Sequence, residues 1–163
     1  MIVLRRGKEK DIESIQDLAD RTWWNTYDYL SDEQIRYMLD KMYNKAELLS
    51  QFKAGYIFLI AESEGLDLGF AGFSVLDSSK GIYKLHKLYV LPETHGRGVG
   101  KLLINEVVNL VKRANGSALQ LSVNRNNNAA EFYKKAGFVI KETIDLDIGN
   151  GFLMNDYVME KII

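Results

Sequence analysis

The chain of 163 residues has no cysteine, one proline and two histidines. Without cysteine it can form no disulfide, no thiolate metal site and no thiol nucleophile. Both histidines lie far from any His/Asp/Glu cluster, so we expect no metal centre. No apolar run approaches the ~18 residues that span a bilayer, and the amino terminus shows no signal-peptide core. These absences predict a cytoplasmic protein that does not associate with membranes.

The charge balance shows no excess of either sign. The formal net charge is −1, which gives no reason to expect binding to nucleic acid or to an anionic surface. Hydrophobic residues make up 47% of the chain and charged residues 26%, as is typical of globular proteins. The length and the lack of a linker predict one domain over residues 1–163.

The most informative segment is a glycine-rich loop between an expected strand and an expected helix. The strand covers residues 82–90, the helix 100–113, and the loop between them reads His95-Gly96-Arg97-Gly98-Val99-Gly100-Lys101. Glycines allow a tight turn, and a helix N-terminus directs backbone N–H groups and positive partial charge at an anion. The pattern therefore predicts a phosphate or pyrophosphate site. The alternative is a glycine-rich turn before an ordinary helix.

Two common phosphate motifs do not fit this loop. A Walker loop requires glycine where His95 stands and serine or threonine where Leu102 stands. In a dinucleotide fingerprint the third glycine comes one residue later than Gly100 does here. These departures exclude the simplest nucleotide-binding interpretations.

A second motif follows the next expected strand, residues 118–123. Its characteristic residues are Asn126, Ala129, Phe132, Tyr133, Gly137 and Phe138. Together the two motifs resemble those of the GNAT superfamily of acetyl-CoA-dependent N-acetyltransferases. The glycine loop departs from the family pattern at His95, where glutamine or arginine is usual. The resemblance is clearest over residues 55–140, and the flanks are loosely similar to bacterial polyamine acetyltransferases.

The expected elements match the order of the GNAT fold. Strands are expected at 3–6, 55–61, 66–76, 82–90, 118–123, 138–147 and 152–161, and helices at 11–24, 31–42, 100–113 and 128–135, with 46–52 either continuing the second helix or following it as a short one. This order, β-α-α-β-β-β-α-β-α-β-β, predicts an α+β protein with a mixed, mostly antiparallel sheet of six or seven strands.

The resemblance implies where acetyl-CoA binds as co-substrate. Backbone N–H groups from His95 to Leu102 would hold the pyrophosphate, so the implied residues are His95, Gly96, Arg97, Gly98, Val99, Gly100, Lys101 and Leu102. The pantetheine arm would pair with the backbone of Leu88, Tyr89 and Val90. Asn126 would contact the same arm through its side chain, or it could cap the helix that follows.

Two residues are candidates for catalysis. The resemblance places Tyr133 near the cofactor sulfur, where a phenol can protonate a departing thiolate; the alternative is an aromatic packing residue. His86 has the intrinsic pKa of a base at neutral pH, on a strand where many relatives carry a glutamate. A structural role for His86, with water as the route for the proton, remains open.

The acceptor site is less defined. Trp23, Trp24 and Tyr27 belong to an aromatic stretch. The resemblance implies that this region walls the acceptor pocket, where the rings could stack on an amine; the alternative is a hydrophobic anchor between helices. Acidic residues in 145–147 and at Asn155-Asp156 would bind a cationic acceptor, or would lie in a solvated hairpin.

The sequence thus predicts an N-acetyltransferase acting on a primary amine of a small molecule or peptide, by direct transfer in a ternary complex. The alternative is a non-catalytic acyl-CoA-binding module. The acceptor and the oligomeric state are left open, with a homodimer as one option.

Overall fold

The computed structural model describes residues 1–163 and is organised around one sheet of seven strands. The strands are β1 (Val3–Arg6), β2 (Ile57–Ser63), β3 (Leu66–Asp77), β4 (Ile82–Val90), β5 (Ala118–Asn124), β6 (Val139–Gly149) and β7 (Phe152–Ile162). The helices are α1 (Ile12–Thr26), α2 (Asp32–Tyr43), α3 (Lys45–Lys53), α4 (Val99–Arg113) and α5 (Ala129–Lys135). Short 3₁₀ turns at Glu9–Asp11 and Pro92–Thr94 were not expected from the sequence. The expected α+β order is confirmed.

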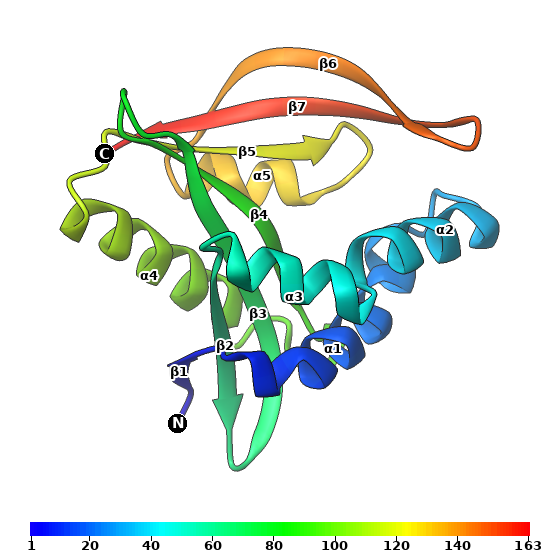
Figure 1. Ribbon diagram of the computed structural model, residues 1–163, viewed down its shortest axis with the longest axis horizontal. Coiled ribbons are helices and arrows are strands. Elements are labelled where there is room, and N and C mark those ends of the chain that lie inside the picture. Colours follow the sequence, from blue (N-terminus) through cyan, green and yellow to red (C-terminus); the bar gives the residue numbers. More distant parts are fainter.

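Strand pairing is antiparallel except at the centre of the sheet (Figure 1). The spatial order is β1-β2-β3-β4-β5-β7-β6, and only β4 and β5 run parallel. Parallel neighbours need a crossover connection, and α4 supplies it. The carboxyl ends of β4 and β5 therefore lie at the same edge of the sheet.

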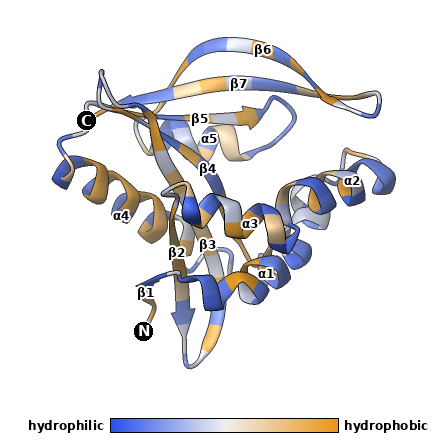
Figure 2. Ribbon diagram, viewed as in Figure 1, coloured by the Kyte–Doolittle hydropathy of each residue, from blue (hydrophilic) through white to orange (hydrophobic).

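Each face of the sheet buries its own apolar cluster. α4 and α5 cover one face, where Leu103, Val107 and Val111 of α4 recur every four residues and are fully buried. Helices α1, α2 and α3 cover the other face, with Ile15, Met38 and Leu48 in its core. In Figure 2 much of α4 and of β2 is coloured as hydrophobic.

The helix starts follow local capping rules. The Ser31 hydroxyl accepts a hydrogen bond from the Gln34 amide, and the Asn44 side chain accepts one from the Glu47 amide. Each bond satisfies an N–H group that the first turn leaves without a partner. Ser31 is therefore the N-cap of α2, at the start of the helix expected over 31–42.

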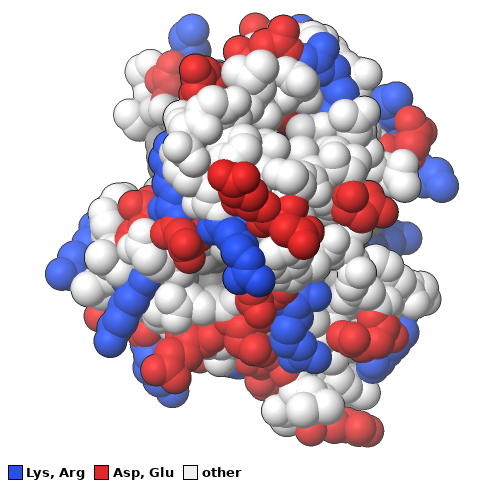
Figure 3. All heavy atoms as spheres, turned by 90° about the vertical axis from the view of Figure 1, so that its right-hand side faces the viewer, with Lys and Arg blue, Asp and Glu red and all other residues white.

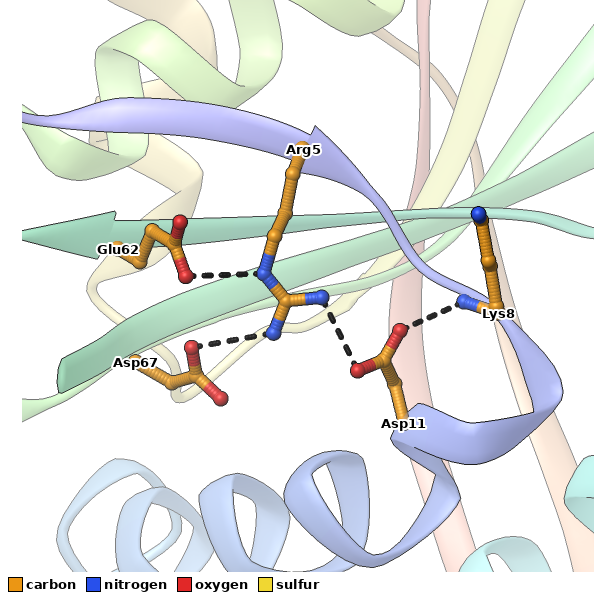
Figure 4. A network of polar contacts seen from close by, with 5 residues as sticks. All are labelled: Arg5, Lys8, Asp11, Glu62 and Asp67. Atoms are coloured by element: carbon orange, nitrogen blue, oxygen red, sulfur yellow. Dashed lines mark hydrogen bonds and ion pairs between the residues drawn. The ribbon is translucent and has the colours of Figure 1, made fainter. Parts of the chain in front are cut away.

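A network centred on Arg5 fastens the amino-terminal strand to the sheet (Figure 4). Its guanidinium donates to carboxylates of Glu62 at 3.0 Å, Asp11 at 3.0 Å and Asp67 at 3.3 Å. Asp11 also accepts from the backbone amide of Lys8 at 2.8 Å. One guanidinium thereby joins β1, β2, the start of β3 and the turn before α1, which fixes the helix whose far end borders the site.

The parallel pair separates halfway along its length. β4 and β5 pair only from Ile82 with Ala118 to Leu85 with Leu121. A bulge leaves His86 without a partner on β3, because Leu85 and Lys87 pair with successive residues there. Beyond this point β4 remains paired with β3, whereas β4 and β5 diverge.

The β6–β7 hairpin reaches over α2. The Tyr37 hydroxyl and the Lys41 ammonium both donate to the carbonyl of Ile148, at 3.0 and 2.7 Å. Figure 3 shows the side of the molecule that carries α2 and the hairpin tip, where acidic and basic side chains are interspersed. None of the helices is long and apolar enough to cross a membrane.

Candidate active site

A cleft of about 720 Å³ opens where β4 and β5 diverge. Its walls are the second half of β4, the glycine loop with the start of α4, the end of β5 with the segment leading into α5, and the segment that ends α1. Ligand sites in sheets with parallel strands commonly lie beyond the strands' carboxyl ends. This cleft is in that position.

Backbone N–H groups that have no acceptor in the protein lie together at one end of the cleft, and we refer to them as the cradle. Gly96 and Gly98 adopt φ of +89° and +78°, a left-handed conformation that favours glycine, and Gly98 is the N-cap of α4. The N–H groups of His95, Arg97 and Leu102 are bonded internally, to Pro92, Thr94 and Gly98. Five others in the segment have no acceptor within the protein, namely those of Gly96, Gly98, Val99, Gly100 and Lys101. The expected set of donors is therefore reduced to these five.

The side chains of this segment divide between two surfaces. His95 and Lys101 line the cleft, which adds an imidazole and a cation beside the N–H groups. Arg97 instead lines a separate depression bordered by Glu93 and Asp17. Leu102 does not line the cleft, and it is 41% exposed. The cradle is thus mainly a backbone feature, supported by Lys101.

The second half of β4 offers free peptide groups to the cleft. Leu88, Tyr89 and Val90 pair with β3 on one side and have no strand partner on the other. The Leu91 amide donates to Leu68 on β3, so by the alternation of antiparallel pairs the peptide groups of Leu88 and Val90 point away from β3. These groups suit an extended ligand arm that would lie along the strand.

Asn126 is free to act on a ligand. Its side chain is exposed, lines the cleft and makes no cap, whereas the adjacent Asn127 accepts from the Ala129 amide at 2.9 Å. The capping role that the sequence allowed for Asn126 is therefore not seen. Its backbone amide is held by the Asn124 side chain at 2.9 Å, which fixes its position.

Tyr133 lies on α5 and lines the cleft from within the core. It is 7% exposed, and its ring packs against Phe132 and Phe138 with centroids 5.2 and 5.7 Å away. Burial raises the pKa of the Tyr133 phenol, so the hydroxyl remains protonated at neutral pH. Packing and proton donation are therefore compatible roles for this residue.

His86 occupies the bulge of β4. Its ring stacks on Tyr56 at 4.4 Å, and its Nε2 is 2.7 Å from the Ser74 hydroxyl. Burial, and then the charges of Lys84 and Lys87, lower the pKa of His86 to about 4. At neutral pH the ring is uncharged and hydrogen-bonded, which makes it a weak base.

The structure brings only one of the three expected acceptor aromatics into the cleft. Tyr27 lines it, with its hydroxyl 2.8 Å from that of Tyr89. Trp23 is 2% exposed and packs between Tyr27, Tyr43 and Tyr89, because its helical position puts it on the core face of α1. One position further, Trp24 is half-buried at the edge of the same core cluster, with the guanidinium of Arg36 over its ring, and it does not line the cleft. The expected tryptophan wall is not formed.

The comparisons with known proteins agree with this geometry. A family model described as an acetyltransferase (GNAT) domain matches residues 54–140, which is more than half of the chain. The chain belongs to the GNAT family. It is an acetyl-CoA-dependent acyltransferase, and the expectation drawn from the two motifs is confirmed.

Several relatives resemble this GNAT protein over nearly its whole length. The chain is 28% identical to a spermidine N(1)-acetyltransferase of Thermoplasma acidophilum, covering 98% of this chain and 96% of that one. A solved structure of the PaiA N-acetyltransferase of the same organism, in complex with coenzyme A, superimposes with a TM-score of 0.84 at 26% identity, covering 100% and 99% of the two chains. A GCN5-related N-acetyltransferase from Rhodopseudomonas palustris gives a TM-score of 0.82 at 26% identity over 99% and 95%.

Sequence reasoning did not single out several residues that line the GNAT cleft. Asp28 and Tyr29 follow α1, and Ser122 lies on β5. A signal was present for the first two, which belong to the same aromatic stretch as Tyr27. No sequence signal marked Ser122, because its position in the cleft depends on where β5 separates from β4.

Proposed function

We propose that this protein transfers the acetyl group of acetyl-CoA directly to a primary amine of a small molecule, with polyamines as the first candidates. The observation that supports this most is a single cleft that joins the five free N–H groups at α4, the unpaired peptide groups of β4 and the Tyr133 phenol. The relative named a spermidine N(1)-acetyltransferase points to the acceptor class.

Bound acetyl-CoA would supply the acetyl group as a thioester. The N–H groups of Gly98, Val99 and Gly100 would hold its pyrophosphate at the N-terminus of α4, with Lys101 adding charge. The peptide groups of Leu88 and Val90 would hold the extended arm. The absence of cysteine agrees with direct transfer, since no thiol can carry the acetyl group.

The proposed reaction needs two proton movements. The neutral amine attacks the carbonyl carbon, a C–N bond forms and the C–S bond breaks, so the nitrogen loses one proton and the thiolate gains one. Tyr133 is the proposed donor to the thiolate. Burial raises the pKa of a thiol as well as that of a phenol. Within the cleft the pKa of the leaving thiol and the pKa of Tyr133 therefore shift in the same direction.

An acceptor that arrives as an ammonium gives up two protons, the first before the nitrogen attacks and the second as the amide forms. An alkylamine with a pKa near 10.4 must lose a proton before it attacks. His86 lines the cleft, but its lowered pKa and its bond to Ser74 leave little basicity. We therefore favour loss of the first proton before binding, and water rather than His86 as the acceptor of the second.

The direct test is acetyl transfer by the purified protein. Thiol release from acetyl-CoA is measured with polyamines, monoamines, amino acids and peptide N-termini, and each product is checked by mass for one added acetyl group. We expect turnover with at least one small amine, and none in a Gly100→Asp variant. If the protein binds coenzyme A but no amine causes release of thiol from acetyl-CoA, the result would instead indicate a non-catalytic binding module.

A further inference from the structure

Lys87 is the one cationic side chain that the fold buries. It is 7% exposed, and no other lysine or arginine is buried. Its stem passes over β3 at Gly72, where an added Cβ atom would lie 3.5 Å from the Lys87 Cδ. Its ammonium lies 5.1 Å from the ring centroid of Tyr43 and 5.9 Å from that of Tyr56. Lys87 therefore lies on the face of the sheet that α1, α2 and α3 cover.

This ammonium has no partner for its charge. No ion pair or hydrogen bond within the chain involves the Lys87 Nζ. An unpaired buried charge is costly, and two aromatic rings offset only part of the cost. The Nζ is not among the unpartnered side-chain atoms that are closed off from solvent, so it keeps some accessible surface. Because Lys87 lines the cleft while the rings and β3 cover its stem, that surface opens into the cleft.

Lys87 lies where an arm held along β4 would end. The cradle follows the carboxyl end of β4, so an arm that starts there runs along the strand from Val90 back to Leu88. The split between β4 and β5 closes a few residues before Leu88, at the pair of Leu85 with Leu121. The reacting end of the arm is therefore expected at the closed end of the split, beside Lys87.

Different side chains reach this end of the cleft from the two faces of the sheet. Tyr133 belongs to the cluster under α4 and α5. Lys87 lies over Tyr43 of the opposite cluster, to which Tyr27 and Tyr89 also belong. The phenol that we assign to the thiolate and the ammonium of Lys87 thus approach the split from opposite sides.

The surroundings of Lys87 favour its neutral form. Burial lowers the pKa of Lys87 to about 8, and the charge of Glu47 only partly opposes this. Glu47 is held by Gln51 at 3.0 Å instead of pairing with Lys87. The titratable groups that surround the ammonium are Tyr43 of α2, Glu47 of α3, Tyr56 before β2, and His86 and Tyr89 of its own strand. The neutral amine has a free lone pair, whereas the Nε2 atom of His86 is bonded to Ser74.

We propose that neutral Lys87 is the final acceptor of the second proton that the attacking nitrogen loses, received through the water in the cleft. As the C–N bond forms and the C–S bond breaks, this proton passes from nitrogen to water and from water to the Lys87 Nζ. The Tyr133 hydroxyl gives its proton to sulfur. The Lys87 ammonium and the Tyr133 phenolate then return to their starting forms by exchange with solvent. This role rests on the proposed function.

The first test replaces the amine in two ways. Lys87→Met keeps an apolar stem, and Lys87→Arg keeps a cation that cannot lose its proton. We expect both to lower kcat at pH 8 by about 10²-fold, as for a lost general base. Wild-type kcat at saturating amine should rise with pH and level off above about 8, and this inflection should be missing in both variants. Their affinity for coenzyme A should stay within about threefold.

Two controls separate proton transfer from charge and packing. Lys84→Met removes a half-buried lysine of the same strand that does not line the cleft, and it should keep both the rate and the profile. Trimethylamine accepts a proton but has no N–H bond and forms no amide. It should therefore raise the rate of Lys87→Ala with increasing concentration and leave the wild type unchanged.

A second test needs no turnover. In the NMR spectrum of protein with ¹⁵N-labelled lysine, the Lys87 signal is assigned by its loss in Lys87→Met. We expect it to titrate near pH 8, and to shift when coenzyme A saturates the protein, while the Lys84 signal stays in place. A midpoint near the ordinary 10.5, or no response to coenzyme A, would contradict the proposal.

Four further outcomes would overturn the role of Lys87. Normal kcat in Lys87→Met would show that no proton goes to this residue, and normal kcat in Lys87→Arg would do so even if Lys87→Met does not fold. An equal loss in Lys84→Met would assign the effect to the general field. A stable acetyl group on Lys87 after incubation with acetyl-CoA alone would make Lys87 a nucleophile.

The failure of the proposed function would look different. In that case the wild type itself would release no thiol from acetyl-CoA with any amine, at any pH. That result overturns the role of Lys87 together with the proposed function, whereas a failure of the Lys87 proposal alone leaves a wild type that turns over as fast as its Lys87→Met variant.

Discussion

Replacing Tyr133 by phenylalanine removes one oxygen atom and keeps the ring that the core requires. The ring is 7% exposed and packs against Phe132 and Phe138. Truncation to alanine would cost about 3–5 kcal/mol of stability, the usual range for a buried aromatic. Loss of the hydroxyl alone should stay within about 1 kcal/mol, which corresponds to a shift of roughly 2–4 °C in the thermal midpoint of a chain of this size.

The effect on the rate should be much larger than the effect on stability. A positioned general acid contributes about 10²- to 10⁴-fold, and a 10²-fold loss equals about 2.7 kcal/mol in the activation free energy. We expect kcat of Tyr133→Phe with acetyl-CoA to fall by at least about 10²-fold. Affinity for coenzyme A should hardly change, because the free N–H groups that we assign to its pyrophosphate lie on the glycine loop and α4.

The assay uses two donors that differ in their leaving group. Thiol release is followed with acetyl-CoA and with an aryl thioester of acetic acid, whose more acidic thiol needs no proton from the enzyme. The ratio of wild-type to variant rates should be large for the first donor and close to one for the second. Tyr83→Phe is the matched control, since Tyr83 packs against the same apolar cluster and does not line the cleft. Normal turnover of Tyr133→Phe with acetyl-CoA would refute the role of proton donor and leave Tyr133 a packing residue.

Three further predictions concern the cofactor end and His86. Gly100→Asp should abolish coenzyme A binding in calorimetry, because it places a carboxylate among the free N–H groups; unchanged affinity in a folded variant would exclude the cradle. His95→Gln should leave that affinity within a few-fold, about 1 kcal/mol, because the cradle is formed by backbone; a hundred-fold loss would contradict this. In an NMR titration the folded-state pKa of His86 should lie near 4, below its ordinary 6.5, so the stability from its neutral ring is complete above about pH 6.5 and declines as the pH falls toward 4. A midpoint near 6.5 would refute this burial effect and revive His86 as a base at neutral pH.

The parts of this fold that depend on local pattern could be predicted from the sequence. The helical spacing of apolar residues such as Leu103, Val107 and Leu110 predicts a helix over 100–113, and α4 is observed over 99–113. The alternatives for Trp23 could not be separated in the same way. A period of 3.6 shows that Trp23 and Trp24 face different directions, but which direction leads to the core depends on the sheet that α1 covers.

Features that arise from pairing between distant strands had no local signal. The divergence of β4 and β5 after Leu85 coincides with a bulge at His86, which no residue type in that strand predicts. The burial of Asp156 depends on its position opposite Asn124, which belongs to another strand. In the sequence alone, Asn155-Asp156 is indistinguishable from a polar turn, so a buried carboxylate could not be separated from a solvated one.

The single parallel pair in an otherwise antiparallel sheet explains why two motifs separated in sequence serve one site. The segment after β4 carries the glycine loop, and the segment after β5 carries Asn126 and leads to Tyr133 on α5. Antiparallel strands would place these segments at opposite edges of the sheet, whereas parallel strands place both at one edge. Because the pair also separates there, the backbone of β4 is free to hold an extended arm between the cradle and the phenol. The distance in sequence between the two motifs is therefore the length of the crossover through α4. An insertion in the connection from α4 to β5, far from the cleft, should leave the site intact as long as Ile82 still pairs with Ala118.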